Sequence, residues 1–437
     1  MSPITIGAAL LLLFALGVPI AISLAGTAAL AMHASGIPLQ AMVQRMFAAL
    51  DSFPLTAIPF FILAGALMEA SGISQRLIGF AQALVGRATG GLGLVTVVSA
   101  MFFAAISGSS AATTAAIGGT LIPAMARRGF PRPFATSVQA ASGELGVIIP
   151  PSIPMIIFAL TAGVPVSIGS LFMAGVVPGL LVGGSLLVTV YVICRVRGYG
   201  RVTPPAGGAA EPGALGEPEG IGAAFRAALL PLLLPVIILG GIYGGIFTPT
   251  EAAAVAVFFA LFVGAAVYRT LTPARLFTAL RVSLLSTVVI LIIISAASVF
   301  GWVLTANRIP EMIARFFIAL SDDPKVFLLL VNVFLLLVGM FLETGAAITI
   351  LAPILTPVAV VMGIDPVHFG IIMIVNLAVG MTTPPVGVNL FVACQVAGLR
   401  IEQILKSMLP FYFVLLLDIL ILTYLPQISM WLPRALG

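Results

Sequence analysis

Small hydroxylated residues and glycine gather in the middle of one long apolar stretch. Residues 97–125 read VVSAMFFAAISGSSAATTAAIGGTLIPAM, with Ser107-Gly-Ser-Ser110 at the centre. If the chain turns here inside a membrane, its irregular backbone must line a polar cavity or be buried in protein. The freed carbonyl and hydroxyl oxygens are hard ligands that suit a small cation such as sodium. The same small residues would also allow close helix packing, and the segment alone leaves both interpretations open.

Two adjacent prolines interrupt a second apolar stretch. Residues 141–158 read ASGELGVIIPPSIPMIIF. The prolines remove two amide donors and free carbonyl groups one turn earlier. Carbonyls between Gly146 and Ile149 are therefore expected to lack helical partners, and a bound cation could satisfy them. The alternative is that the proline pair only kinks a helix.

The second half of the chain repeats this combination. It offers Leu342-Glu-Thr-Gly-Ala346 as a turn and Val379-Gly-Met-Thr-Thr-Pro-Pro-Val-Gly387 as a broken helix. At an offset of 234 residues, Pro123 matches Pro357, Gly146 matches Gly380, and the two proline pairs coincide. This order and offset indicate an internal duplication. Two cation sites related by that duplication are our hypothesis.

Few acidic residues lie within or beside the apolar runs. They are Glu69, Glu144, Glu251, Glu343 and Asp418, five of the fourteen in the chain. Each would cost at least about 2–3 kcal/mol at the centre of a bilayer. Glu343, at a predicted turn, is expected to act on a cation or proton. Glu251 either touches a ligand or is a favourable charge at a helix N-terminus.

A basic residue also ends one of the apolar runs. Arg308 follows the run that ends at Asn307. It either attracts an anionic substrate or anchors the helix at the membrane interface.

The composition defines the elements that must position these residues. Of 437 residues, 61% are hydrophobic and only 8% charged, whereas a soluble domain has about 25% charged residues. Apolar stretches of helical length recur throughout, so we expect an all-α, polytopic membrane protein. A soluble domain, a disordered chain and a nucleic-acid binder are excluded. No His/Asp or Ser/Lys pair is found, so we expect no enzymatic activity and no cofactor.

A polar linker rich in glycine and proline divides the apolar runs into two halves. The expected division is 1–194, a cytoplasmic linker over 195–226, and 227–437. Each half is expected to hold about five transmembrane helices, one re-entrant hairpin and one broken helix. The expected hairpins span about 92–126 and 325–362, and the broken helices about 134–162 and 366–398.

The distribution of basic residues predicts how the halves are oriented. With this topology, fourteen of the nineteen Lys and Arg residues fall on one side of the membrane and five on the other. This positive-inside bias places both termini outside and gives the halves opposite orientation. Inverted repeats with broken helices are the architecture of secondary transporters.

Several long motifs resemble one family. They are LTAIPFFILAG (55–65), SGSSAATTAAIG (107–118), GELGVIIPPSIPMIIF (143–158), GIFTPTEAAAVAVFFALFV (245–263), ETGAAITILAPILTP (343–357) and GIIMIVNLAVGMTTPPVGVNLFVA (370–393). In this order, and over essentially the whole chain, they resemble the large membrane (permease) subunit of tripartite ATP-independent periplasmic (TRAP) transporters. A stand-alone sodium/carboxylate symporter of the same broad superfamily is the nearest alternative.

The resemblance implies sodium symport of a small organic acid, such as a dicarboxylate or sugar acid, across the bacterial inner membrane. It also implies an elevator mechanism and two partners, a small four-helix membrane subunit and a periplasmic substrate-binding protein. Sodium is the only metal it implies. Many relatives have aspartate where Glu343 stands.

The resemblance also implies three sets of site residues. The first sodium site would use Ser107, Ser110, Gly146, Ile149 and Pro151. The second would use Glu343, Thr344, Gly345, Gly380 and Thr383. The substrate would lie between the hairpin tips, with Ser109, Glu251 and Arg308 as candidate contacts.

Overall fold

The computed structural model describes most of the chain, and every regular element in the described part is helical. The described residues are 3–200, 220–309, 311–313, 315 and 323–436. Residues 201–219, which make up most of the expected linker, lie outside the described residues, and so does Arg201.

The helices of the first half are short except for the last. Their bounds are α1 Pro3–Ala15, α2 Ile20–Ala34, α3 Leu39–Leu50, η1 Phe53–Thr56, α4 Ala57–Ala70, α5 Ile73–Val85, α6 Gly91–Ser107, α7 Ser110–Arg127, α8 Arg132–Gly143, α9 Leu145–Ile148, α10 Ile153–Thr161 and α11 Ile168–Arg197. Breaks fall at glycine and proline. Gly17 adopts φ +73°, Gly72 adopts φ +71°, and Pro19 directly precedes α2.

The second half contains α14, the longest of the described helices. The bounds are α12 Ile221–Tyr243, α13 Pro249–Phe262, η2 Val263–Val267, α14 Pro273–Ala306, α16 Pro324–Gly339, α17 Thr344–Val361, α18 Pro366–Gly380, α19 Val388–Ala397, α20 Ile401–Tyr424 and α21 Pro426–Leu436. The start of helix α14 is capped. The Thr272 side chain accepts a hydrogen bond from the Arg275 backbone N–H, and Pro273 occupies the first helical position.

Seven of the described helical segments are long and apolar enough to cross a membrane, and a bent pair adds an eighth. The bent pair joins residues 132–148 to α10 at an angle of 46°. The exterior is apolar as well, because Phe47, Phe258 and Phe413 are each more than 70% exposed. Such a surface fits a lipid environment rather than water.

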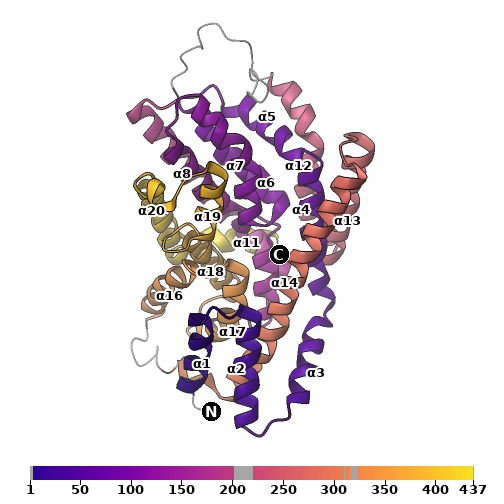
Figure 1. The fold of residues 1–437 in the computed structure, drawn as a ribbon, viewed down its shortest axis with the longest axis vertical. Coiled ribbons are helices and arrows are strands. Elements are labelled where there is room, and N and C mark those ends of the chain that lie inside the picture. The colour runs from indigo at the N-terminus through magenta and orange to yellow at the C-terminus, as the bar shows by residue number, and fades with distance from the viewer. Residues whose placement is uncertain (1–2, 201–219, 310, 314, 316–322, 437) are drawn as a thin grey trace.

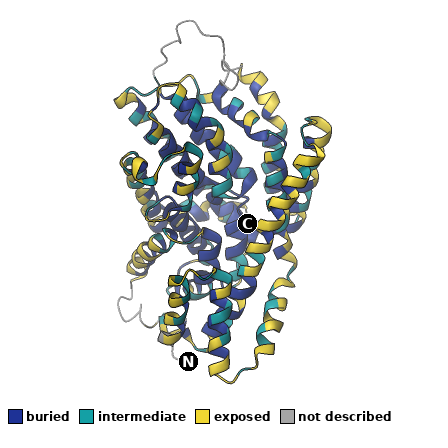
Figure 2. Ribbon diagram, in the orientation of Figure 1, coloured by how far each residue is buried: buried dark blue, intermediate teal, exposed yellow. Residues whose placement is uncertain are grey.

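Helices lie on both sides of a central, largely buried group (Figure 1 and Figure 2). Helices α3, α4 and α13 lie on one side of the molecule, and α8, α16 and α20 lie on the other. Helix α14 packs against α2, α3 and α4, and it also reaches α17. Buried residues concentrate where α6, α7, α11 and α18 meet (Figure 2). This buried group includes α6 and α7, which contain Ser107 and Ser110, and α18, which contains Gly380.

Candidate functional site

The turn between α6 and α7, here called the first tip (residues 107–110), is a compact cluster of oxygen atoms. Helix α6 ends at Ser107, Gly108 turns the chain at φ +60°, and the Ser109 side chain accepts a hydrogen bond from the Ala112 N–H. The Ser107 hydroxyl lies 2.9 Å from Thr113 Oγ1. Thr113 in turn donates to the Ser109 carbonyl at 2.8 Å. Hydroxyl and carbonyl oxygens therefore converge within one turn of chain.

The first broken helix, α8–α10, approaches this tip very closely. A Cβ added at Gly146 would lie 2.6 Å from Thr113 Oγ1 and closer still to the Ser109 carbonyl. A Cβ added at Gly108 would lie 2.9 Å from the Pro151 carbonyl. Glycine is therefore required at both positions by the contact. The structure brings Ser107, Gly146 and Pro151 together around neutral oxygens of the kind that ligate small hard cations.

The other two residues assigned to the first site lie at its edges. Ile149 ends α9 in an extended conformation, and its side chain packs against Gly179 of α11. Ser110 begins α7, and its hydroxyl donates to Asn389 Oδ1 at 3.0 Å. Asn389 belongs to the second half of the chain, so a side chain of the second half contacts the first tip.

The turn between α16 and α17, here called the second tip (residues 342–345), carries a charge. The Glu343 side chain caps α17 by accepting a hydrogen bond from the Ala346 N–H at 3.1 Å, and it remains exposed. The Thr344 hydroxyl contacts Met381 Sδ at 3.5 Å. The Gly387 N–H donates to the Met340 carbonyl at 3.0 Å. These contacts fix the tip to the second broken helix, α18–α19.

Two residues assigned to the second site have a different environment. A Cβ added at Gly380 would lie 2.6 Å from Gly339 Cα, so Gly380 faces α16. The Thr383 hydroxyl donates to the Val379 carbonyl at 2.9 Å, and its N–H donates to Gly380 at 2.8 Å. Gly380 is the last residue of α18 and Thr383 lies in the break that follows, whereas Gly345 is packed beside the Glu343 carboxylate.

A cavity of about 540 Å³ lies between the two tips. Its walls include Gly108, Ser109 and Ser110 of the first tip, and Glu343 and Gly345 of the second. The opposite wall belongs to α14. It contributes Leu285, Ser286, Val289, Ile290 and Ile293. We call this space the tip cavity. Its size is typical of small-molecule sites.

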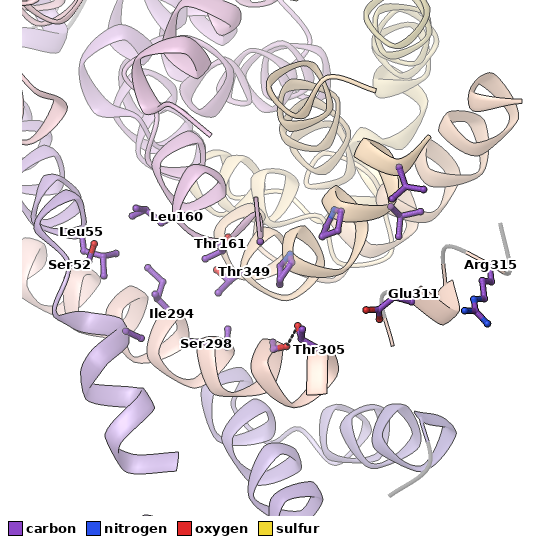
Figure 3. Close-up of a pocket in the computed structure, with 18 residues that line it drawn as sticks. Ser52, Leu55, Leu160, Thr161, Ile294, Ser298, Thr305, Glu311, Arg315 and Thr349 are labelled. Carbon is purple, nitrogen blue, oxygen red and sulfur yellow. Dashed lines mark hydrogen bonds between the residues drawn. The ribbon is translucent and has the colours of Figure 1, made fainter. Parts of the chain in front are cut away.

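A second cavity of about 800 Å³ continues along the same face of α14 (Figure 3). Ile294, Ser298 and Thr305 of α14 line it opposite Thr161 and Thr349, and Thr349 also lines the tip cavity. Glu311 and Arg315 lie at one end. We call this space the vestibule, because it adjoins the tip cavity through Thr349.

Two of the three predicted substrate contacts lie elsewhere. The Glu251 carboxylate accepts hydrogen bonds from the Thr248 N–H at 2.8 Å and the Thr248 hydroxyl at 2.9 Å, forming a capping box at the start of α13. Arg308 is exposed beyond the end of α14, with φ +53°. Neither residue lines the tip cavity or the vestibule, whereas Ser109 lines the tip cavity.

Three polar residues at the site were not selected from the sequence. They are Thr113, which bonds within the first tip, Thr349, which lines both cavities, and Asn389, which contacts Ser110. Asn389 follows the second proline pair inside an apolar run, and an isolated asparagine in that position was an available signal. The threonines gave no such signal, because their segments contain many hydroxylated residues.

The apolar helices define a polytopic membrane protein, and a solved structure shares the fold. The chain is similar to the crystal structure of the Alcanivorax borkumensis YdaH transporter, with a TM-score of 0.61. The similarity covers 90% of this chain and 88% of the other, at 18% sequence identity.

The sequence comparisons identify the family. Residues 8–428 match the family described as tripartite ATP-independent periplasmic transporter, DctM component. The C4-dicarboxylate TRAP transporter large permease protein DctM of Pseudomonas aeruginosa is 44% identical, over 91% of this chain and 90% of its own length. The sialic acid TRAP transporter large permease protein SiaM of Vibrio cholerae is 39% identical, over 97% and 96%.

A further relative is longer than this chain. The isethionate TRAP transporter permease protein DctMQ of Oleidesulfovibrio alaskensis is 45% identical over 96% of this chain, which spans 64% of that relative's length.

The chain belongs to the DctM family of TRAP transporter large permeases. It is a multi-pass protein of the bacterial inner membrane.

Proposed function

We propose that this permease couples sodium entry to the uptake of a small organic acid across the inner membrane. The observation that carries the proposal is the tip cavity, which is bounded by both tips and backed by the oxygen cluster of the first. Substrate would bind between the tips, and sodium would bind behind them.

The chemistry of the first tip supports sodium as the coupling ion. The oxygen atoms that converge there are neutral. They are the hydroxyls of Ser107 and Thr113 and the carbonyl of Ser109, and Gly146 packs against them. Neutral oxygen atoms can coordinate a monovalent cation, whereas several carboxylates would favour a divalent one. The second tip differs, because a cation there would lie beside the Glu343 carboxylate.

The electrostatics of the tip cavity support an anionic substrate that depends on bound cations. Helices α7 and α17 both begin at the cavity, and helix N-termini attract anions. Glu343 opposes this attraction by its own charge. Sodium bound at the second tip would neutralise Glu343 and so favour binding of a carboxylate. The relatives named for C4-dicarboxylate and sialic acid suggest this substrate class.

The packing of the tips supports the inverted-repeat interpretation. Helix α7 of the first pair packs against α19 of the second broken helix, and α17 of the second pair packs against α10 of the first. In each half, the helix that follows the tip therefore packs against the broken helix of the other half. We propose that both tips and both broken helices form a transport domain. Helices α2, α3, α4, α13 and α14 form the scaffold along which it slides as an elevator.

Two partners complete the proposed system. A periplasmic binding protein would deliver the substrate to the vestibule end of α14, opposite the basic end of that helix at Arg275 and Arg281. A small four-helix membrane subunit would join the scaffold. The names of the P. aeruginosa and V. cholerae relatives, each a large permease protein, suggest the second partner.

Reconstitution tests the coupling. The chain is placed in liposomes with its small subunit and binding protein, and a thermal-shift ligand screen on the binding protein selects the radiolabelled acid. Uptake is expected under an inward sodium gradient and is expected to be absent under an equal potassium gradient. Equal uptake in both gradients would overturn sodium coupling. Full uptake without the binding protein would overturn the tripartite assignment.

Cross-linking tests the sliding motion. Ser109 and Val289 line the tip cavity from opposite walls, so a Ser109→Cys, Val289→Cys pair joins the proposed transport domain to the scaffold. In a background in which Cys194 and Cys394 are replaced by alanine, a short reversible cross-linker should stop uptake until it is reduced. A Phe53→Cys, Thr250→Cys pair, at a contact within the scaffold, is the control. Uptake that continues with the first pair cross-linked contradicts the elevator.

A further inference from the structure

A hydrogen bond joins the first tip to the second half of the chain. The Ser110 hydroxyl donates to Asn389 Oδ1 at 3.0 Å, across 279 residues of sequence. Ser110 is 3% exposed and Asn389 is fully buried. Ser110 begins α7, and Asn389 lies in the first turn of α19. The bond therefore connects a predicted sodium ligand to the broken helix of the other half.

Asn389 is also connected to the second tip. Its backbone N–H donates to the Met381 carbonyl at 2.9 Å and so bridges the break between α18 and α19. The Met381 side chain in turn contacts the Thr344 hydroxyl at 3.5 Å. The contacts run without interruption from Ser110 through Asn389 and Met381 to Thr344. They link a residue of each predicted sodium site.

The side chain of Asn389 is incompletely paired. Its Nδ2 is buried and has no hydrogen-bond partner among the residues that the structure describes. If the amide rotates by half a turn, Nδ2 meets Ser110 and the oxygen is left unpaired instead. An unpaired buried polar atom costs about 1–3 kcal/mol. An apolar residue would remove this unpaired atom but would leave the buried Ser110 hydroxyl without the acceptor that Asn389 provides.

We propose that Asn389 is a positioning residue that couples the two sodium sites. It holds the Ser110 hydroxyl of the first tip in place, and its backbone fixes the break that carries the second site. Ordering of one tip by sodium therefore favours ordering of the other, which is positive cooperativity. This inference rests on the proposed sodium-coupled uptake.

The test measures the sodium dependence of uptake in the reconstituted complex at saturating substrate. The variants are Ser110→Ala, Asn389→Val and the double variant. Loss of about 1 kcal/mol of hydrogen bonding predicts a sodium half-saturation concentration raised about three- to tenfold in each single variant. The Hill coefficient should fall toward one. The double variant should be no worse than the weaker-binding single variant, because both changes remove the same bond.

Two further variants provide controls. Ser142→Ala removes a similarly buried hydroxyl that, among the described residues, donates to the Val138 carbonyl of its own helix, and sodium dependence should not change. Asn389→Asp keeps the acceptor for Ser110, so its half-saturation concentration should be no higher than that of the wild type. If Asn389→Val does not fold, as judged by size-exclusion chromatography, Asn389→Ala takes its place.

The outcomes separate this inference from the proposed function. An unchanged Hill coefficient in Asn389→Val, or additive effects in the double variant, overturns the coupling role while sodium-driven uptake stands. If wild-type uptake does not depend on sodium at all, the proposed function itself is wrong.

Discussion

The two tips occupy equivalent places in the chain but differ in chemistry. The first tip is neutral and closed, with Ser107 bonded to Thr113 and only 5% exposed. The second tip exposes the Glu343 carboxylate to the tip cavity while capping its own helix. The first is therefore suited to enclose an ion, and the second to respond to charge in the cavity. A duplicated pattern does not impose a duplicated site.

The matched glycines of the broken helices show the same divergence. Gly146 and Gly380 are 234 residues apart and occupy corresponding positions before the proline pairs. Gly146 faces the oxygens of the first tip, whereas Gly380 faces Gly339 of α16. One glycine makes room for a ligand cluster, and the other lets two helices touch. Substitutions at both positions can test this distinction.

The largest effect is expected at Gly146. In Gly146→Ala the new methyl group would collide with the Ser109 carbonyl and Thr113 Oγ1 and push the broken helix away from the first tip. Overpacking of about 1–3 kcal/mol predicts a loss of sodium-driven uptake of about tenfold or more. Uptake is measured in proteoliposomes under a sodium gradient.

The control for this prediction lies on α7. Gly119→Ala adds the same methyl group where no described atom beyond its own helical backbone lies within 4 Å, so uptake should match the wild type. Thermal unfolding of both purified variants separates loss of the site from loss of the fold. A Gly146→Ala protein with normal sodium affinity would remove the first tip from the coupling mechanism.

The next largest effect is expected at Glu343. Glu343→Gln removes the charge that faces the tip cavity, so the sodium half-saturation concentration should rise about tenfold, as for the loss of a charge-assisted contact. Glu343→Asp keeps the charge, and aspartate is a preferred N-cap, so uptake and helix capping should survive. Sodium titrations of uptake distinguish the two variants. Equal titrations for both would show that the charge of Glu343 has no part in coupling.

The sequence predicted the helical, multi-pass membrane fold and the family, and both are confirmed. These follow from composition and from motifs such as GELGVIIPPS, which are local properties of the chain. The environment of Gly380 could not be predicted, because it depends on the approach of α16. The same holds for Asn389, whose partner Ser110 is distant in sequence. The α14 wall of the tip cavity was also missed, since its apolar residues resemble those of any membrane helix.

A moderate effect, on stability rather than on coupling, is expected at Gly380. In Gly380→Ala the new Cβ would lie 2.6 Å from Gly339 Cα and force α16 and α18 apart. The cost of about 1–3 kcal/mol should lower the melting temperature by several degrees. Gly184→Ala on α11, where nothing lies within 4 Å, should not lower it. If Gly380→Ala leaves stability intact but shifts the sodium titration, Gly380 belongs with Gly146 as a site residue.

The smallest effect is expected at Glu251, which shares its residue type with Glu343 but not its surroundings. Its carboxylate accepts hydrogen bonds from Thr248 in the capping box of α13, and it is exposed and lines neither cavity. Glutamine retains an oxygen that can accept the Thr248 N–H, so Glu251→Gln should keep uptake within about twofold of wild type, as for most surface changes. Glu343→Gln, the same substitution at the second tip, is the matched comparison. If Glu251→Gln abolishes uptake while the protein remains folded, position at the tips does not decide which carboxylate matters.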